Sequence, residues 1–175
     1  IPLYGGRVIA AGSSNVIIRY IRMRGSIAMN RSKCTLTLDN CDKVILDHCS
    51  ISWGRWDNVH IKDATNITWQ NCIISEGIDP QRFVVIPDGT TNWTVAHCLW
   101  ADNKSRNPKM KCGIQYYNNV VYNYGNGIIG GHSSAHHYQD VINNYFITGP
   151  NSGSSNKYFD QWTETDHLYS TGNYT

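Results

Sequence analysis

The stretch Val44-Ile45-Leu46-Asp47-His48-Cys49 is the clearest of several short β-rich runs that recur along this 175-residue chain. Each run contains a residue that aligns with Cys49, so the runs define a column of equivalent positions. The members of this column are Ile21, Cys49, Cys72, Cys98, Asn119, Asn144 and Asn173. Neighbouring members are 21 to 29 residues apart. A period of about 25 residues with variable insertions is typical of solenoid proteins.

The residues within each repeat decide which kind of solenoid is expected. No segment shows sustained helical periodicity, and no leucine-rich pattern occurs. Each repeat holds two or three short runs of β-forming residues separated by Gly, Asn or Asp. The pattern predicts an all-β parallel β-helix of about seven coils, in which equivalent residues lie above one another about 4.8 Å apart.

The column has a physical meaning in such a fold. We expect Asn119, Asn144 and Asn173 to form a ladder of amide hydrogen bonds along the helix axis. The three cysteines of the column are expected to stack as small, buried and reduced side chains. The sequence leaves open whether Cys34 and Cys41 form a disulfide.

Composition and charge narrow the classes of function. The formal net charge is +2 at pH 7, which does not favour a protein that binds nucleic acid through bulk charge. No run approaches the roughly 18 apolar residues of a membrane span, so no membrane segment is expected. The length predicts one β-helix domain over residues 1–175. The start at Ile1-Pro2 and the end within a further strand suggest a piece of a longer protein.

Segments 44–54, 72–77, 105–109 and 118–123 carry four distinctive motifs. In order and spacing they are similar to the segments (I/V)DHCSxSWG, CIIxEGL, SRNPR and NNVVYNW. In these four segments the chain resembles the pectate lyase superfamily. The resemblance implies a right-handed parallel β-helix and a secreted lyase that cleaves an acidic, uronate-containing polysaccharide such as pectate or pectin by β-elimination. We expect a monomer whose partner is this polysaccharide, with neither nucleic acid nor membrane.

The resemblance also implies roles for three basic residues. Arg106 stands at the position of the proposed base that takes the C5 proton of a uronate. Lys111 stands at the position of a second basic residue, and Arg82 is the nearest match to a lysine that binds the substrate carboxylate. Such cations suit β-elimination, because negative charge builds on the carboxylate. An arginine base is unusual, since its free pKa exceeds about 12, and it requires burial beside other cations or a metal.

The chain departs from the family at the calcium-binding positions. Residues 31–34 read Arg-Ser-Lys-Cys where calcium-dependent members carry one or two aspartates. Alignment on Trp53-Gly54 places Trp56 and His60 where the family has an acid pair, and a slip of one residue would make Asp57 a metal ligand. Calcium takes about six to eight oxygen ligands. The sequence therefore leaves open whether calcium is a cofactor, although most of the family's acidic ligands are replaced.

A lyase without a dedicated calcium cage would use cations and aromatic residues instead. In this interpretation Arg55, Trp56, Asp57 and Asn58 form the floor of the substrate groove, and Trp56 stacks on a sugar ring. Arg55, Trp56, Arg82 and Lys111 are then the substrate-binding candidates.

A serine hydrolase is not expected from the Asp-His pair in the opening motif. Asp47 and His48 are consecutive on a predicted strand, so their side chains should point to opposite faces. They could not form a Ser-His-Asp triad with Ser50 or Ser52 in that geometry. The pair is interpreted as structural.

Three other interpretations remain. His132, His136 and His137 either line the substrate groove or, less in keeping with metal geometry, bind a metal from one loop. Glu76 and Asp79 could be the acid pair of a glycoside hydrolase, but they lie in a single turn, whereas that chemistry needs facing carboxylates. A non-catalytic carbohydrate-binding β-helix is the alternative from another class, because solenoids offer long binding faces.

Overall fold

The computed structural model describes residues 1–78, 83–86, 89–131 and 136–175, with only the backbone of residues 83–86. The described residues form three parallel sheets of seven strands each, and no helix occurs among them. Successive strands along the chain belong to different sheets, so each coil contributes one strand to each sheet. The predicted parallel β-helix is confirmed, and its seven strands per sheet correspond to about six full turns.

Sheet A contains short strands that follow the column identified in the sequence. Its strands are β1 (Pro2–Tyr4), β4 (Arg22–Arg24), β7 (Ser50–Ser52), β10 (Ile73–Ser75), β13 (Leu99–Ala101), β16 (Val120–Tyr122) and β19 (Tyr145–Ile147). Sheet B follows along the chain. Its strands are β2 (Val8–Ile9), β5 (Leu36–Thr37), β8 (Asp57–His60), β11 (Phe83–Ile86), β14 (Lys109–Met110), β17 (Asn126–Ile129) and β20 (Lys157–Asp160).

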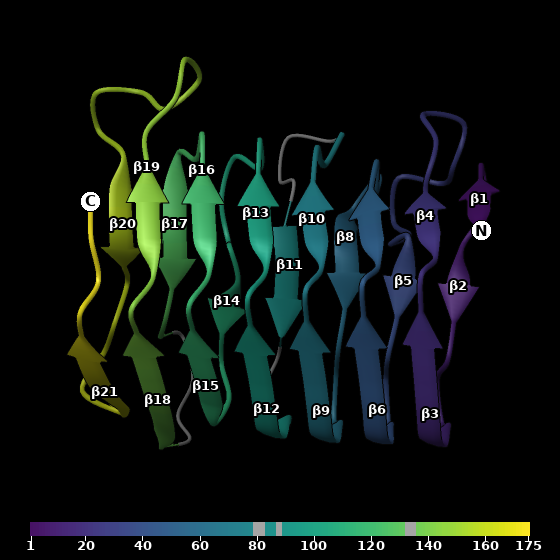
Figure 1. The fold of residues 1–175 in the computed structure, drawn as a ribbon, viewed down its shortest axis with the longest axis horizontal. Coiled ribbons are helices and arrows are strands. Elements are labelled where there is room, and N and C mark those ends of the chain that lie inside the picture. Colours follow the sequence, from purple (N-terminus) through teal and green to yellow (C-terminus); the bar gives the residue numbers. More distant parts are fainter. Residues whose placement is uncertain (79–82, 87–88, 132–135) are drawn as a thin grey trace.

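Sheet C contains the longest strands. They are β3 (Ser14–Arg19), β6 (Asp42–Asp47), β9 (Thr65–Gln70), β12 (Thr91–Ala96), β15 (Ile114–Tyr117), β18 (His137–Ile142) and β21 (Asp166–Thr171). In Figure 1 the strands of sheets A and C point upward, and those of sheet B run downward behind them. The loops from sheet A to sheet B therefore lie along the upper edge of the view, and those from sheet B to sheet C along the lower edge.

Alternation along the strands builds the core. Val44 and Leu46 of β6 are fully buried, and they align with Ile67 and Trp69 of β9. Trp69 packs edge-on against Trp93 of the next coil, with ring centroids 5.1 Å apart. Side chains that alternate along each strand, repeated from coil to coil, thus form one continuous interior.

The column of equivalent residues lies at the turn from sheet C to sheet A. Each column residue is preceded by a residue with positive φ, which bends the chain sharply. These residues are Tyr20, His48, Asn71, His97, Asn118, Asn143 and Gly172. Asparagine and glycine tolerate this backbone conformation best, which explains why Asn recurs at the turn.

The predicted amide ladder is confirmed. The side-chain oxygen of Asn144 accepts hydrogen bonds from the backbone N–H and the Nδ2 of Asn119, at 2.9 and 3.0 Å. The oxygen of Asn173 accepts the equivalent pair from Asn144, both at 2.9 Å. All six cysteines are buried and free, so Cys34 and Cys41 do not form a disulfide.

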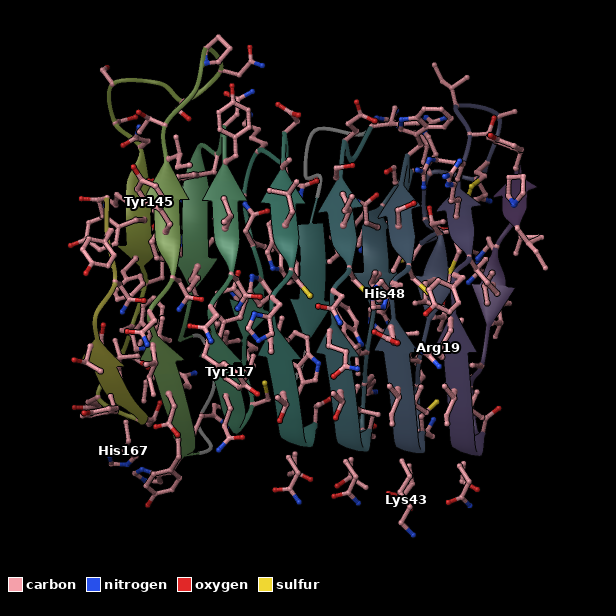
Figure 2. The ribbon with its side chains drawn as sticks, viewed as in Figure 1. Arg19, Lys43, His48, Tyr117, Tyr145 and His167 are labelled. Carbon is pink, nitrogen blue, oxygen red and sulfur yellow. The ribbon has the colours of Figure 1, made fainter. Side chains whose placement is uncertain are left out.

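The expected separation of Asp47 and His48 is wrong. The Nδ1 of His48 lies 2.7 Å from Oδ1 of Asp47, because His48 has a φ of 52° and leaves the strand geometry. Arg19 donates to the other oxygen of Asp47 at 2.7 Å, and Figure 2 shows Arg19 and His48 on neighbouring coils. Burial raises the pKa of Asp47, but hydrogen bonds from Asn71, His48 and Arg19 outweigh it and lower this pKa to about 2.

Candidate functional site

Four of the candidate residues lie along the edge where sheet A connects to sheet B. Arg55 and Trp56 belong to the loop between β7 and β8, and Asp57 is the first residue of β8. Arg106 lies in the loop between β13 and β14, whereas Lys111 follows β14 at its other end. Arg82 lies outside the described residues.

Arg55 and Trp56 differ in what they can offer to a substrate. The guanidinium of Arg55 donates to the backbone carbonyl groups of Ile27 and Met29, and so ties this loop to the loop of the preceding coil. The side chain of Trp56 is 46% exposed, and its backbone N–H donates to the carbonyl of Lys33 at 3.1 Å. Trp56 therefore presents an exposed ring, and the hydrogen bonds of Arg55 and of its own backbone N–H hold its backbone in place.

Asp57 is fully buried rather than part of an open groove floor. Neither of its carboxylate oxygens has a hydrogen-bond partner. Burial raises the pKa of Asp57 to about 8, although the positive charge of Arg106 works in the opposite direction. The carboxyl group is therefore mainly protonated at neutral pH.

Arg106 is partly buried and has a positive φ of 57°. Burial lowers the pKa of its guanidinium, whereas the negative charge of Asp57 raises it. A lower pKa is the direction that a base requires.

A buried amide network joins the two loops, and no motif or spacing in the sequence predicts it. Nδ2 of Asn58 donates to the carbonyl of Ser75 at 2.9 Å and to Oδ1 of Asn103 at 3.2 Å. The backbone N–H of Gly54 donates to Oδ1 of Asn58 at 3.0 Å. Asn107 extends the network, because its Nδ2 donates to the carbonyl of Asn103 at 3.4 Å. The network holds the loop before Asp57 to the loop that carries Arg106.

The outer face of sheet B carries a second set of polar residues. His60 of β8 lies 2.7 Å from Asp39, measured between Nδ1 and Oδ1. His60 pairs with Val85, and Val85 pairs with Lys109 of β14. Lys109 is largely covered, at 7% exposure, and Lys111 follows it at the next outward position.

The chain is similar to fungal proteins named probable pectate lyase C. It is 36% identical to that of Aspergillus terreus over 95% of this chain and 42% of the relative. It is also 36% identical to that of Aspergillus fumigatus, over 99% of this chain and 42% of the relative. The chain spans about 42% of the length of these curated relatives. No family model matches the chain.

This similarity supports the pectate lyase superfamily for the chain. The resemblance drawn from the four sequence motifs is thereby confirmed. The similarity extends over nearly the whole chain, so it includes the loops that carry Trp56, Asp57 and Arg106. In the described part of the chain, no helix is long and apolar enough to cross a membrane.

The donor set of the described residues does not fit the calcium cage of calcium-dependent pectate lyases. Among these residues, no group of three or more His, Cys, Asp or Glu side chains could hold a metal ion. Asp57 offers a single carboxyl group, which is fully buried. Calcium prefers about six to eight charged or carbonyl oxygens, which this group alone does not supply.

The remaining polar candidates lie elsewhere or have structural partners. His136 and His167 stack where strands β18 and β21 of sheet C begin, with ring nitrogens 3.1 Å apart. Figure 2 shows His167 at the lower edge of the view. His136 and Tyr138 line a hollow of about 580 Å³ on sheet C, away from the Arg106 loop. His132 lies outside the described residues.

The proposed acid pair of a hydrolase is only partly described. Oε2 of Glu76 accepts a hydrogen bond from the indole N–H of Trp53 at 2.9 Å. Asp79 lies outside the described residues. Glu76 therefore has a partner in the SWG turn of the preceding coil.

Proposed function

We propose that the chain is part of a secreted polysaccharide lyase that cleaves a uronate polymer, such as pectate or pectin, by β-elimination. The observation that carries this proposal is the partly buried Arg106, whose pKa is lowered by burial, on the loop where the family motif places a base. The names of the fungal relatives point to the same class of substrate. We propose an extracellular monomer that needs neither nucleic acid nor a membrane.

The chain's own residues can be assigned to the steps of this reaction. Neutral Arg106 takes the proton from C5 of a uronate unit. The electron pair of the C5–H bond forms the C4=C5 double bond, and the bond from C4 to the glycosidic oxygen breaks. The departing oxygen takes a proton from water. Lys111 and Arg82 neutralise the carboxylate, on which negative charge builds in the transition state.

The aromatic and amide residues of the edge position the polymer. Trp56 presents an exposed ring on which a sugar can stack, and Arg55 holds its loop to residues 27–29. The network of Asn58 and Asn103 keeps the Arg106 loop at a fixed distance from this platform. Fixed placement matters, because positioning the reacting groups contributes a large part of the rate.

The ultraviolet absorbance of the unsaturated uronate product tests the proposed function directly. The full-length protein is mixed with polygalacturonate or with methylated pectin, each with calcium and with EDTA. Rising absorbance on either polymer is the expected result. New reducing ends without absorbance would instead indicate a hydrolase, and flat traces on both polymers with retained binding would indicate a carbohydrate-binding β-helix.

The Arg106→Ala variant separates catalysis from binding. Turnover is expected to fall by at least about 100-fold, because general-base catalysis contributes on that order. Binding of trigalacturonate should change much less. His48→Ala is the matched control, since His48 lies at the turn between sheets C and A and should leave turnover unchanged. Equal losses in both variants would show that Arg106 has no special role.

A further inference from the structure

The outer face of sheet B carries a histidine to which the proposed function gives no role. His60 lies between Val59 and Ile61, whose side chains are fully buried in the core. Because side chains alternate along a strand, His60 points outward. Its Nδ1 lies 2.7 Å from Oδ1 of Asp39, and both side chains are 27% exposed.

Asp39 determines which ring nitrogen of His60 is available. An ionised carboxylate can only accept hydrogen bonds, so the proton of this contact belongs to Nδ1 of His60. The neutral ring then directs the lone pair of Nε2 away from Asp39. No described residue hydrogen-bonds to Nε2. Such a lone pair accepts a hydrogen bond from a hydroxyl group and repels a carboxylate.

The register of sheet B places His60 near the candidate site. His60 pairs with Val85, and Val85 pairs with Lys109, which follows Arg106 by three residues. Strands of one sheet lie about 4.8 Å apart, so His60 and Lys109 are roughly 10 Å apart along the row. A short oligosaccharide that crosses the coils on this face would contact both His60 and Lys111, the next outward residue after Lys109.

We propose that His60 contacts the polysaccharide and accepts, through Nε2, a hydrogen bond from a ring hydroxyl of a uronate unit. This inference rests on the proposed function. It assigns the carboxylates and the ring hydroxyls of the polymer to different residues of the protein. Lys111 contacts a carboxylate, whereas His60 recognises an unsubstituted hydroxyl group. Asp39 is a positioning residue, because it fixes the tautomer of the ring. The site therefore discriminates against polymers acetylated on these hydroxyls.

Binding measurements on a pair of ligands test this contact. The probes are trigalacturonate and its O-acetylated form, titrated calorimetrically. His60→Ala is expected to weaken the binding of trigalacturonate about five-fold, the worth of one neutral hydrogen bond. The same variant should bind the acetylated ligand as the wild type does. His60→Gln, whose amide oxygen can accept, should recover part of the discrimination.

His48→Ala is a closely matched control for this experiment. His48 has the same contact as His60, with Nδ1 2.7 Å from a carboxylate oxygen, but it lies at the turn from sheet C to sheet A. Its substitution should leave both affinities unchanged. The inference is overturned if His60→Ala weakens both ligands equally, or weakens neither.

Nitrogen NMR of the His60 ring provides a readout that does not depend on turnover. Trigalacturonate should shift the Nε2 signal of His60, and Asp39→Asn should change the ring from one tautomer toward a mixture. An unmoved Nε2 signal at saturating trigalacturonate would overturn the contact. A protein that shows this shift but cleaves no polymer would overturn only the proposed lyase activity.

Discussion

Asp57 combines full burial with two carboxylate oxygens that lack partners, and its folded-state pKa is about 8. The unfolded value is about 3.9. Asp57 in the folded protein therefore binds more protons than in the unfolded chain between these values, so its contribution to stability is fully present below about pH 4 and is lost as the pH rises through about 8. From pH 5 to pH 8 we expect the free energy of unfolding to decrease by a few kcal/mol.

The Asp57→Asn variant tests the origin of this pH dependence. The amide cannot titrate, so urea unfolding at pH 5 and at pH 8 should give nearly equal free energies. Asp63→Asn is the control, because Asp63 is exposed and should leave the dependence as in the wild type. An unchanged slope in Asp57→Asn would assign the pH dependence to other groups.

The motifs place Arg106 and Trp56 along the chain, and their roles stay predictions, but spacing does not determine what surrounds them. The burial of Asp57 depends on how loops of different coils pack over the start of β8, and spacing carries no information on that. His48 was misplaced for a local reason, since its positive φ ends the alternation on which the expectation relied.

At the scale of the element, the loop before β8 depends on a glycine. A Cβ atom at Gly54 would overlap the backbone carbonyl of Asp57. Gly54→Ala is expected to displace the start of β8 and to lower the free energy of unfolding by about 1 to 3 kcal/mol, as overpacking does. Gly153→Ala is the control, because nothing lies within 4 Å of its added methyl group. Similar effects in both variants, measured by urea unfolding, would contradict the steric argument.

The turn from sheet C to sheet A depends on the amide ladder. Asn144 is fully buried, and its side chain bonds to Asn119, Asn173 and the carbonyl of Tyr116. Asn144→Ala breaks these bonds and leaves buried groups unpaired, so we expect a loss of about 3 kcal/mol.

Thermal or urea unfolding checks the ladder against an exposed asparagine. Asn151 lies in the loop after β19, and Asn151→Ala should change the free energy of unfolding by less than about 0.5 kcal/mol. A loss in Asn144→Ala no larger than in this control would mean that the ladder contributes little to stability.

At the scale of the whole molecule, the repeat made the fold predictable. A parallel β-helix places like residues above one another, so the column from Ile21 to Asn173 records the stacking directly in the sequence. The number of coils and the ladder followed from that column. The network of Asn58 and Asn103 did not, because it joins loops of different lengths and has no period.

Calcium removal tests how the whole edge neutralises an acidic polymer. Asp57 is a single buried carboxyl group, and the described residues hold no group of three or more potential ligands, whereas Lys111 supplies positive charge. Turnover of polygalacturonate in EDTA is therefore expected to stay within about two-fold of its value in calcium, because cations do the work of the metal. Loss of turnover in EDTA, restored by calcium, would show that carboxylates of the substrate or of other parts of the protein complete a metal site.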